Sequence, residues 1–254
     1  MVSRTLVLVF AAGAGCASAL AQAGGALVDK TKTTPSSARA LTPESRGDIL
    51  MARKEYREAI EAFLEEPKKT AVIYNKVGIA YHQLQQLDSA KKNYEQAVKL
   101  RHDYSEALNN IGTVYYAKKN YRRAISYYNR ALRLNASASI YSNLGTAYFA
   151  RKQYEQATDA YQRAFSLDPD VFERKSNYGT LLQDRNVEER AKFHYYLAKM
   201  YAKAGRNELA LQYVRKALEE GFKDKQKLND DPEFEALRDT PEFQELLTME
   251  PRVL

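Results

Sequence analysis

Four glycines recur through the middle of the chain at nearly constant intervals of 34, 33 and 34 residues: Gly78, Gly112, Gly145 and Gly179. An alanine follows each glycine after twelve residues and another after nineteen. A tyrosine follows after sixteen residues, which gives the column Tyr94, Tyr128, Tyr161 and Tyr195. A degenerate earlier copy begins at Gly47, with Ala59 and Phe63 in the same columns. A fixed period of this length predicts a stack of similar supersecondary units.

Several further residues make this repeat resemble the tetratricopeptide repeat, a helix–turn–helix unit. They are the Ile111-Gly112 and Leu144-Gly145 pairs, the tyrosine three residues after the glycine, the Ala-x3-Tyr-x2-Ala run, and Asp168-Pro169. The resemblance covers about residues 40–221 and implies an all-α fold, a right-handed α-solenoid of helix–turn–helix repeats. The tryptophan that is usual in the first helix of this family is replaced by Tyr74, Leu108, Tyr141 and Lys175.

The columns have a packing interpretation. Glycine allows the second helix of a hairpin to cross the first closely, the alanines lie at similar close contacts, and the tyrosines fill the space beside them. We therefore expect Tyr115 and Tyr128 in the core, whereas Tyr116 and Tyr127 lie on other faces and are available for contacts. One hairpin buries too little apolar surface to be stable alone, so neighbouring hairpins must stack.

The pattern changes near the end of the array. Residues 189–205 fit two repeat registers, which predicts one shared helix with the 207–220 helix packed on it. Two Pro-Glu-Phe segments follow Asp231 and Thr240, and each predicts an N-cap with proline at the first helical position. We assign residues 41–221 to about five to six repeats and residues 222–254 to a short helical C-terminal cap. The cap is expected to bury four apolar side chains on the last repeat: Phe234, Leu237, Phe243 and Leu246.

The first 21 residues have the organisation of a secretory signal peptide. Arg4 supplies a basic start, an apolar run extends from residue 6 to residue 14, and Ala19-Leu20-Ala21 forms an A-x-A cleavage site. The alternative is lipoprotein processing at Cys16, the single cysteine. Residues 22–40 are small, polar and aperiodic, which predicts a disordered linker. We therefore expect an exported bacterial member of the family, located in the periplasm or cell envelope.

Charge and composition argue against several functions. The 39 basic and 32 acidic residues leave a mixed-sign excess of +7, which mainly favours solubility. The three histidines, His82, His102 and His194, lack metal-ligand spacing. The sequence contains neither a glycine-rich phosphate loop nor a G-x-S-x-G motif. We therefore expect no enzymatic activity, no cofactor and no metal.

Function is expected on the concave surface that the first helices of such an array line. The register assigns twelve residues to this candidate binding site: Asn75, Lys76, His82, Asn109, Asn110, Thr113, Tyr116, Ser142, Asn143, Thr146, Phe149 and Asn177. Asparagine recurs two residues before three of the glycines. An amide both donates and accepts, so such a row suits the backbone of an extended peptide and resembles the asparagine ladder of some family arrays. In the structural alternative, these asparagines cap or bridge neighbouring helices.

These observations predict a non-enzymatic protein–protein interaction scaffold in the cell envelope, whose groove binds an extended or helical segment of a protein or peptide partner. The alternative is a factor anchored by a lipid at Cys16 that assembles an envelope machine such as a pilus or polysaccharide exporter. Membrane association is expected only in that case. A third hypothesis is nucleic-acid binding through basic residues of the second helices, but the predicted export argues against it.

Overall fold

The computed structural model describes residues 41–172 and 187–249, and the regular elements in those two ranges are all helices. The chain divides into residues 1–40 and a compact unit that begins at Leu41. The predicted signal peptide and linker, together with Lys175, Asn177 and Gly179, fall outside the described residues. None of the described helices has the length and hydropathy that a membrane crossing requires.

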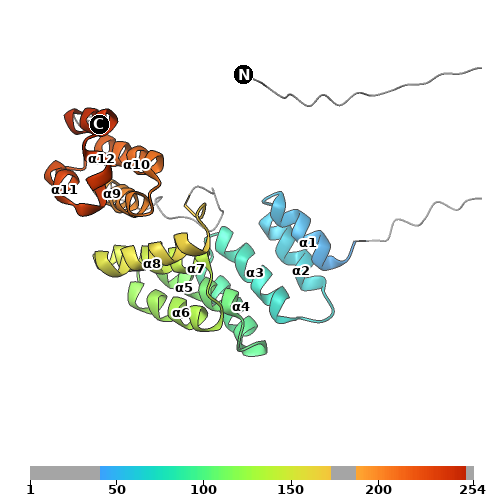
Figure 1. Ribbon diagram of the computed structural model, residues 1–254. Coiled ribbons are helices and arrows are strands. Elements are labelled where there is room, and N and C mark those ends of the chain that lie inside the picture. Colours follow the sequence, from blue (N-terminus) through green and yellow to red (C-terminus); the bar gives the residue numbers. More distant parts are fainter. Residues whose placement is uncertain (1–40, 173–186, 250–254) are drawn as a thin grey trace, which may run out of the picture. The chain divides into compact units, whose positions relative to one another are not determined.

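Residues 43–167 form consecutive helical hairpins (Figure 1). The first helices of the hairpins are α1 (Pro43–Ala52), α3 (Ala71–Gln83), α5 (Ser105–Ala117) and α7 (Ala138–Ala150). The second helices are α2 (Tyr56–Glu65), α4 (Leu87–Leu100), α6 (Tyr121–Leu134) and α8 (Tyr154–Leu167). The two helices of a hairpin contact each other most extensively, and each of α2, α4 and α6 also packs on the first helix of the next hairpin. The predicted stack of helix–turn–helix repeats is therefore confirmed.

Each repeat glycine of these hairpins lies against the aromatic ring that follows it by sixteen residues. A Cβ atom added to Gly112 would lie 2.6 Å from Cε1 and 2.7 Å from Cδ1 of Tyr128. The other hairpins repeat this approach in the pairs Gly47–Phe63, Gly78–Tyr94 and Gly145–Tyr161. Tyr115 and Tyr128 are buried as predicted, and so are Ala124 and Ala131 on the same second helix. The glycine column thus marks the close contact between the two helices.

The turn inside each hairpin contains a residue with a positive φ. Lys119 has a φ of 57°, and its N–H donates to the carbonyl oxygen of Tyr116 at 2.8 Å. The next N–H, of Asn120, donates to the carbonyl oxygen of Tyr115 at 2.8 Å. This pair of bonds is the Schellman arrangement, in which glycine is usual at the left-handed residue. The equivalent residues of the other hairpins are Lys54, Gln85, Lys152 and Gly205.

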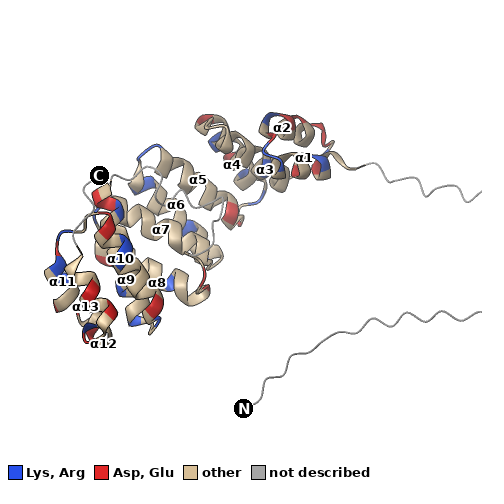
Figure 2. Cartoon of the chain, turned by 90° about the horizontal axis from the view of Figure 1, so that it is seen from above, with Lys and Arg blue, Asp and Glu red and all other residues tan. Residues whose placement is uncertain are grey.

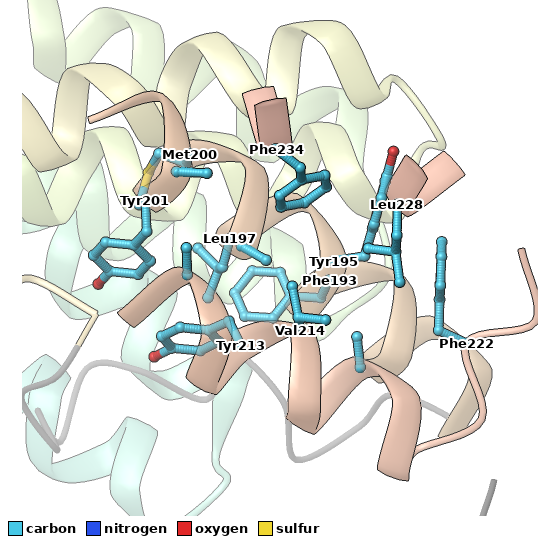
Figure 3. Packing of buried hydrophobic residues seen from close by; sticks show 14 of the residues in the cluster. Phe193, Tyr195, Leu197, Met200, Tyr201, Tyr213, Val214, Phe222, Leu228 and Phe234 are labelled. Carbon is cyan, nitrogen blue, oxygen red and sulfur yellow. The ribbon is translucent and has the colours of Figure 1, made fainter. Parts of the chain in front are cut away.

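The last hairpin consists of α9 (Val187–Lys203) and α10 (Asn207–Glu219), so the predicted shared helix is one continuous helix. Ala198 takes the place of the repeat glycine and is fully buried. The ring of Tyr201 stacks on that of Tyr213 at 5.3 Å, within the cluster of buried side chains shown in Figure 3. The ring of Phe193 lies 5.9 Å from that of Phe149 on α7. The apolar core is therefore shared between α9 and the preceding hairpin.

Short helices cover the last hairpin: α11 (Lys225–Asp230), η1 (Pro232–Phe234), α12 (Glu235–Arg238) and α13 (Pro241–Thr248). The four apolar side chains predicted to be buried here are 0–1% exposed. The hydroxyl of Thr240 accepts a hydrogen bond from the Phe243 N–H at 3.4 Å, as an N-cap does. Asp231 precedes η1 but makes no side-chain cap. Its carboxylate instead accepts from the Tyr195 hydroxyl and lies 3.1 Å from Lys199 Nζ, which ties the cap to α9.

Candidate functional site

The first helices of neighbouring hairpins lie side by side and are joined by side-chain amides. Asn110 on α5 donates to Oδ1 of Asn75 on α3 at 3.0 Å. Asn143 on α7 donates to Oδ1 of Asn109 on α5 at 3.0 Å. Each donor lies two residues before the repeat glycine of its own helix. Each acceptor lies three residues before the repeat glycine of the preceding first helix. The asparagines thus form the bridges that the structural alternative expects.

Lys76 makes the corresponding bridge to the first hairpin. Its Nζ lies 2.7 Å from Oε1 of Glu44 and 2.7 Å from Oδ2 of Asp48, both on α1. Burial acts to lower the pKa of Lys76, but the hydrogen bonds to the two carboxylates outweigh it and raise the pKa above its ordinary value. The side chain is 25% exposed. Its ammonium group therefore joins α3 to α1 through ion pairs and is also accessible at the surface.

The threonine hydroxyl groups of the predicted site make hydrogen bonds inside the hairpins. Thr146 donates to the carbonyl oxygen of Ser142 at 2.9 Å, and its Oγ1 lies 3.3 Å from the hydroxyl of Tyr161. Thr113 accepts from the hydroxyl of Tyr128 at 3.5 Å. Burial raises the pKa of Tyr128, so this phenol stays protonated and needs an acceptor. The two threonines supply partners for buried phenols in successive hairpins.

The ring-bearing residues of the predicted site differ in accessibility. Phe149 is 4% exposed and packs 5.9 Å from the ring of Tyr196 on α9, so it belongs to the core. Tyr116 is half-buried, and its ring lies 5.3 Å from that of Tyr121 on α6. His82 is also half-buried, and burial lowers the pKa of its imidazole. Tyr116 and His82 therefore still offer part of their side chains to the surface, whereas Phe149 does not.

On the side of α3, α5 and α7 that carries the predicted site, seven accessible side chains define what we call the first-helix face: Lys76, His82, Glu106, Thr113, Tyr116, Ser139 and Asn143. Asn177 lies outside the described residues. Glu106 is the one charged residue on α5 and α7, whereas the second helices carry many charges (Figure 2). The face therefore presents mainly amide, hydroxyl, phenol and imidazole groups, which suit hydrogen bonding rather than ion pairing.

A cleft between α6, α7 and α8 was not predicted from the sequence. Its volume is about 760 Å³, and α7 contributes Tyr141, Leu144 and Tyr148 to its lining. Fifteen residues after the repeat glycine, the first four hairpins have Ala62, Asn93, Tyr127 and Ala160. The third of these hairpins alone places an aromatic ring at this position, and the fourth has a small residue beside the cleft.

In the last hairpin, the buried His194 and the half-buried Arg190 both contact the carboxylate of Glu220. Nδ1 of His194 lies 2.7 Å from Oε2 of Glu220, and Nε of Arg190 lies 3.2 Å from Oε1 of that carboxylate. Burial lowers the pKa of His194 although Glu220 favours its protonated form. Across residues 41–172 and 187–249, no group of three His, Cys, Asp or Glu side chains is arranged to hold a metal ion.

Sequence comparisons agree with the observed hairpins. A family model described as "Tetratricopeptide repeat" matches residues 105–137 and 138–171, another with that description matches residues 175–224, and one described as "TPR repeat" matches residues 78–119. The chain is 31% identical over 104 residues to the uncharacterized protein ycf37 of Porphyra purpurea. This alignment covers 36% of this chain and 60% of the ycf37 protein. It is 30% identical over 93 residues to the tetratricopeptide repeat domain-containing protein PYG7, chloroplastic, of Arabidopsis thaliana, with coverages of 34% and 31%. The chain thus spans no more than 60% of the length of these relatives.

Solved structures with similar folds include the APC/C hetero-tetramer Cut9–Hcn1, at a TM-score of 0.51 and 20% identity over 81% of this chain and 35% of that chain. MamA from Desulfovibrio magneticus RS-1 gives a TM-score of 0.48 and 22% identity over 70% of this chain and 92% of that chain. At these identities the likeness concerns the fold alone. The family matches extend over more than half of the sequence, and they coincide with the glycine–tyrosine hairpins. The chain belongs to the tetratricopeptide repeat family.

Proposed function

We propose that this chain is a non-enzymatic scaffold that binds a segment of a protein partner along the first-helix face. Stacked helical repeats create extended binding surfaces, and proteins of this family generally bind proteins or peptides. The observation that carries the proposal is the pair of amide bridges, Asn75–Asn110 and Asn109–Asn143, which hold α3, α5 and α7 side by side. Accessible groups on these helices are thereby kept in a fixed row.

The chemistry of the row suits a peptide backbone. A side-chain amide has two N–H donors and an oxygen with two lone pairs. The bridge to Asn109 uses one donor of the half-buried Asn143, so the same side chain has capacity for a backbone group of a partner. Thr113, Tyr116 and His82 add a hydroxyl, a phenol and an imidazole in the neighbouring repeats. An asparagine can thus bridge two helices and also contact a ligand.

Arginine substitutions at the exposed edge of the face provide the test. Glu106 and Ser139 are exposed and lie three residues before Asn109 and Ser142, on the same side of their helices. Glu106→Arg and Ser139→Arg place a long cation over the row without entering the core. Ser126→Arg is the matched control, because Ser126 is exposed on the second helix α6.

Each full-length variant is used as bait in an envelope extract after circular dichroism has shown an unchanged melting curve. We expect a set of proteins that wild type and Ser126→Arg retain and that Glu106→Arg and Ser139→Arg lose. Equal capture by all four proteins would show that partners bind elsewhere.

We further propose that the scaffold is exported, which rests on the sequence of residues 1–21. Mass spectrometry of the mature protein should then show a chain that starts at Gln22. A diacylated Cys16 would favour the lipid-anchored assembly factor instead. An N-terminus that retains the first residues would contradict export.

A further inference from the structure

The cleft between α6, α7 and α8 is a second candidate for ligand binding, separate from the first-helix face. Its volume of about 760 Å³ lies within the range of ligand pockets. We call it the second-helix cleft, and its lining includes Asn129, Arg133, Tyr148, Glu155, Gln156 and Ala160. They come from α6, α7 and α8, and the lining combines apolar and polar groups.

The preceding hairpin fills the equivalent space with a ring of its own. Tyr127 on α6 stacks on Tyr115 of α5, with ring centroids 5.4 Å apart and planes inclined by 20°. The guanidinium carbon of Arg123 lies 5.3 Å from the centre of the Tyr115 ring, and Nζ of Lys91 lies 5.8 Å from it. The third hairpin thus has room for an aromatic ring stacked on the tyrosine that follows the repeat glycine by three residues.

The fourth hairpin lacks this ring. Ala160 stands where the third hairpin has Tyr127, and Tyr148 stands where that hairpin has Tyr115. Tyr148 lines the cleft and is half-buried. In the part of the chain that the structure describes, no aromatic ring stacks on Tyr148. Tyr148 and Ala160, which is 2% exposed, both line the second-helix cleft, and they stand at the positions that the stacked pair of rings holds one repeat earlier.

The polar residues of the cleft favour a peptide over a polyanion. Glu155 and Asp159 place two carboxylates on the α8 side, although Asp159 is paired with Arg163 at 3.1 Å. Arg133 and Arg163 also line the cleft, so its charged side chains balance and do not give the positive excess that a phosphate group favours. The side-chain amides of Asn129 and Gln156 stand on α6 and α8, and each can donate to and accept from a peptide backbone.

We propose that the second-helix cleft binds an extended peptide segment of a protein partner through one tyrosine or phenylalanine side chain, whose ring stacks on Tyr148 in the place of the missing Tyr127. This inference rests on the proposed function as a protein-binding scaffold but assigns a different face. Asn129 and Gln156 hydrogen-bond the backbone on either side of that ring. The hairpin of α5 and α6 provides the internal template for the contact.

The test uses a probe peptide of defined sequence and two reciprocal variants of the full chain. The probe is acetyl-Ala-Gln-Tyr-Gln-Ala-amide, with acetyl-Ala-Gln-Ala-Gln-Ala-amide as its control. Ala160→Tyr fills the cleft from within, and Tyr127→Ala opens the equivalent space over Tyr115. Binding is followed through the backbone amide shifts of the ¹⁵N-labelled protein.

We expect the tyrosine peptide to shift amides of α6, α7 and α8 in the wild type, and the alanine peptide to bind roughly tenfold more weakly. Ala160→Tyr should weaken binding of the tyrosine peptide by a similar factor. Tyr127→Ala should add a second set of shifts around Tyr115. Glu106→Arg should leave all of these shifts unchanged, which separates failure of this proposal from failure of the first-helix face.

The absence of cleft shifts in the wild type would overturn the proposal, and so would equal binding by folded Ala160→Tyr. If Ala160→Tyr does not fold, Tyr127→Ala decides. New shifts at Tyr115 then support the stacking contact, and their absence refutes it.

Discussion

Replacing Gly112 by alanine tests the contact on which the hairpin packing depends. The added Cβ would lie 2.6 Å from Cε1 and 2.7 Å from Cδ1 of Tyr128, whereas carbon atoms normally approach to about 3.5–4.0 Å. The ring has little room to move, because Tyr128 is 2% exposed. Overpacking of this kind costs about 1–3 kcal/mol, and the better helix propensity of alanine offsets about 1 kcal/mol. We therefore expect Gly112→Ala to lower the free energy of unfolding by up to about 2 kcal/mol.

A double-mutant cycle isolates the ring as the cause. In a Tyr128→Ala background the clash is gone, so Gly112→Ala should raise the unfolding free energy by about 1 kcal/mol through helix propensity alone. The measurement is urea unfolding of the four proteins, followed by circular dichroism at 222 nm. The sign of the alanine effect should therefore reverse between the two backgrounds. Stabilisation by Gly112→Ala in the wild-type background, or destabilisation of equal size in both, would refute the packing argument.

Three further predictions concern the turn at Lys119, the bridge between Asn110 and Asn75, and the half-buried imidazole of His82. Lys119→Gly should raise the unfolding free energy by about 1 kcal/mol by removing the strain of a positive φ; the reciprocal Gly205→Ala should lower it, and equal melting temperatures would contradict this. Asn110→Ala should cost about 1–3 kcal/mol because it leaves Asn75 without its donor, and a cycle with Asn75→Ala should show coupling of the two residues. Because burial lowers the pKa of His82, the unfolded chain binds a proton more readily below about pH 6.5. Stability should therefore fall as the pH drops through that value, with a smaller slope in His82→Gln when urea midpoints are compared between about pH 7.5 and 5.

The hairpins were predictable because their packing is encoded at short range. A glycine and a tyrosine sixteen residues apart lie on the two helices of one hairpin, so their contact repeats with the sequence period. The burial of Tyr115 and Tyr128 followed from this register. The burial of Phe234 and Phe243 in the C-terminal cap was predictable for a similar reason. Each lies two residues after a proline that starts a short helix.

The contacts between repeats were harder to predict. The partner of Asn110 is Asn75, 35 residues earlier, and that choice depends on how one hairpin is displaced relative to the next. Phe149 is buried because α9 packs against it, and α9 departs from the regular register. Asp231 was expected to cap a helix, but a nearby phenol and the Lys199 ammonium group compete successfully for its carboxylate.

The bridge between Lys76 and the acidic pair on α1 has a consequence for the order of the repeats. The later bridges join one neutral amide to another, so hairpins with these amides are chemically interchangeable. The α1–α3 bridge instead matches a cation with Glu44 and Asp48. If a nascent chain docked α3 against the wrong neighbour, the ammonium group would face an asparagine and lose its counter-charge. One electrostatic mismatch thus discourages α3 from docking on a hairpin other than that of α1 and α2.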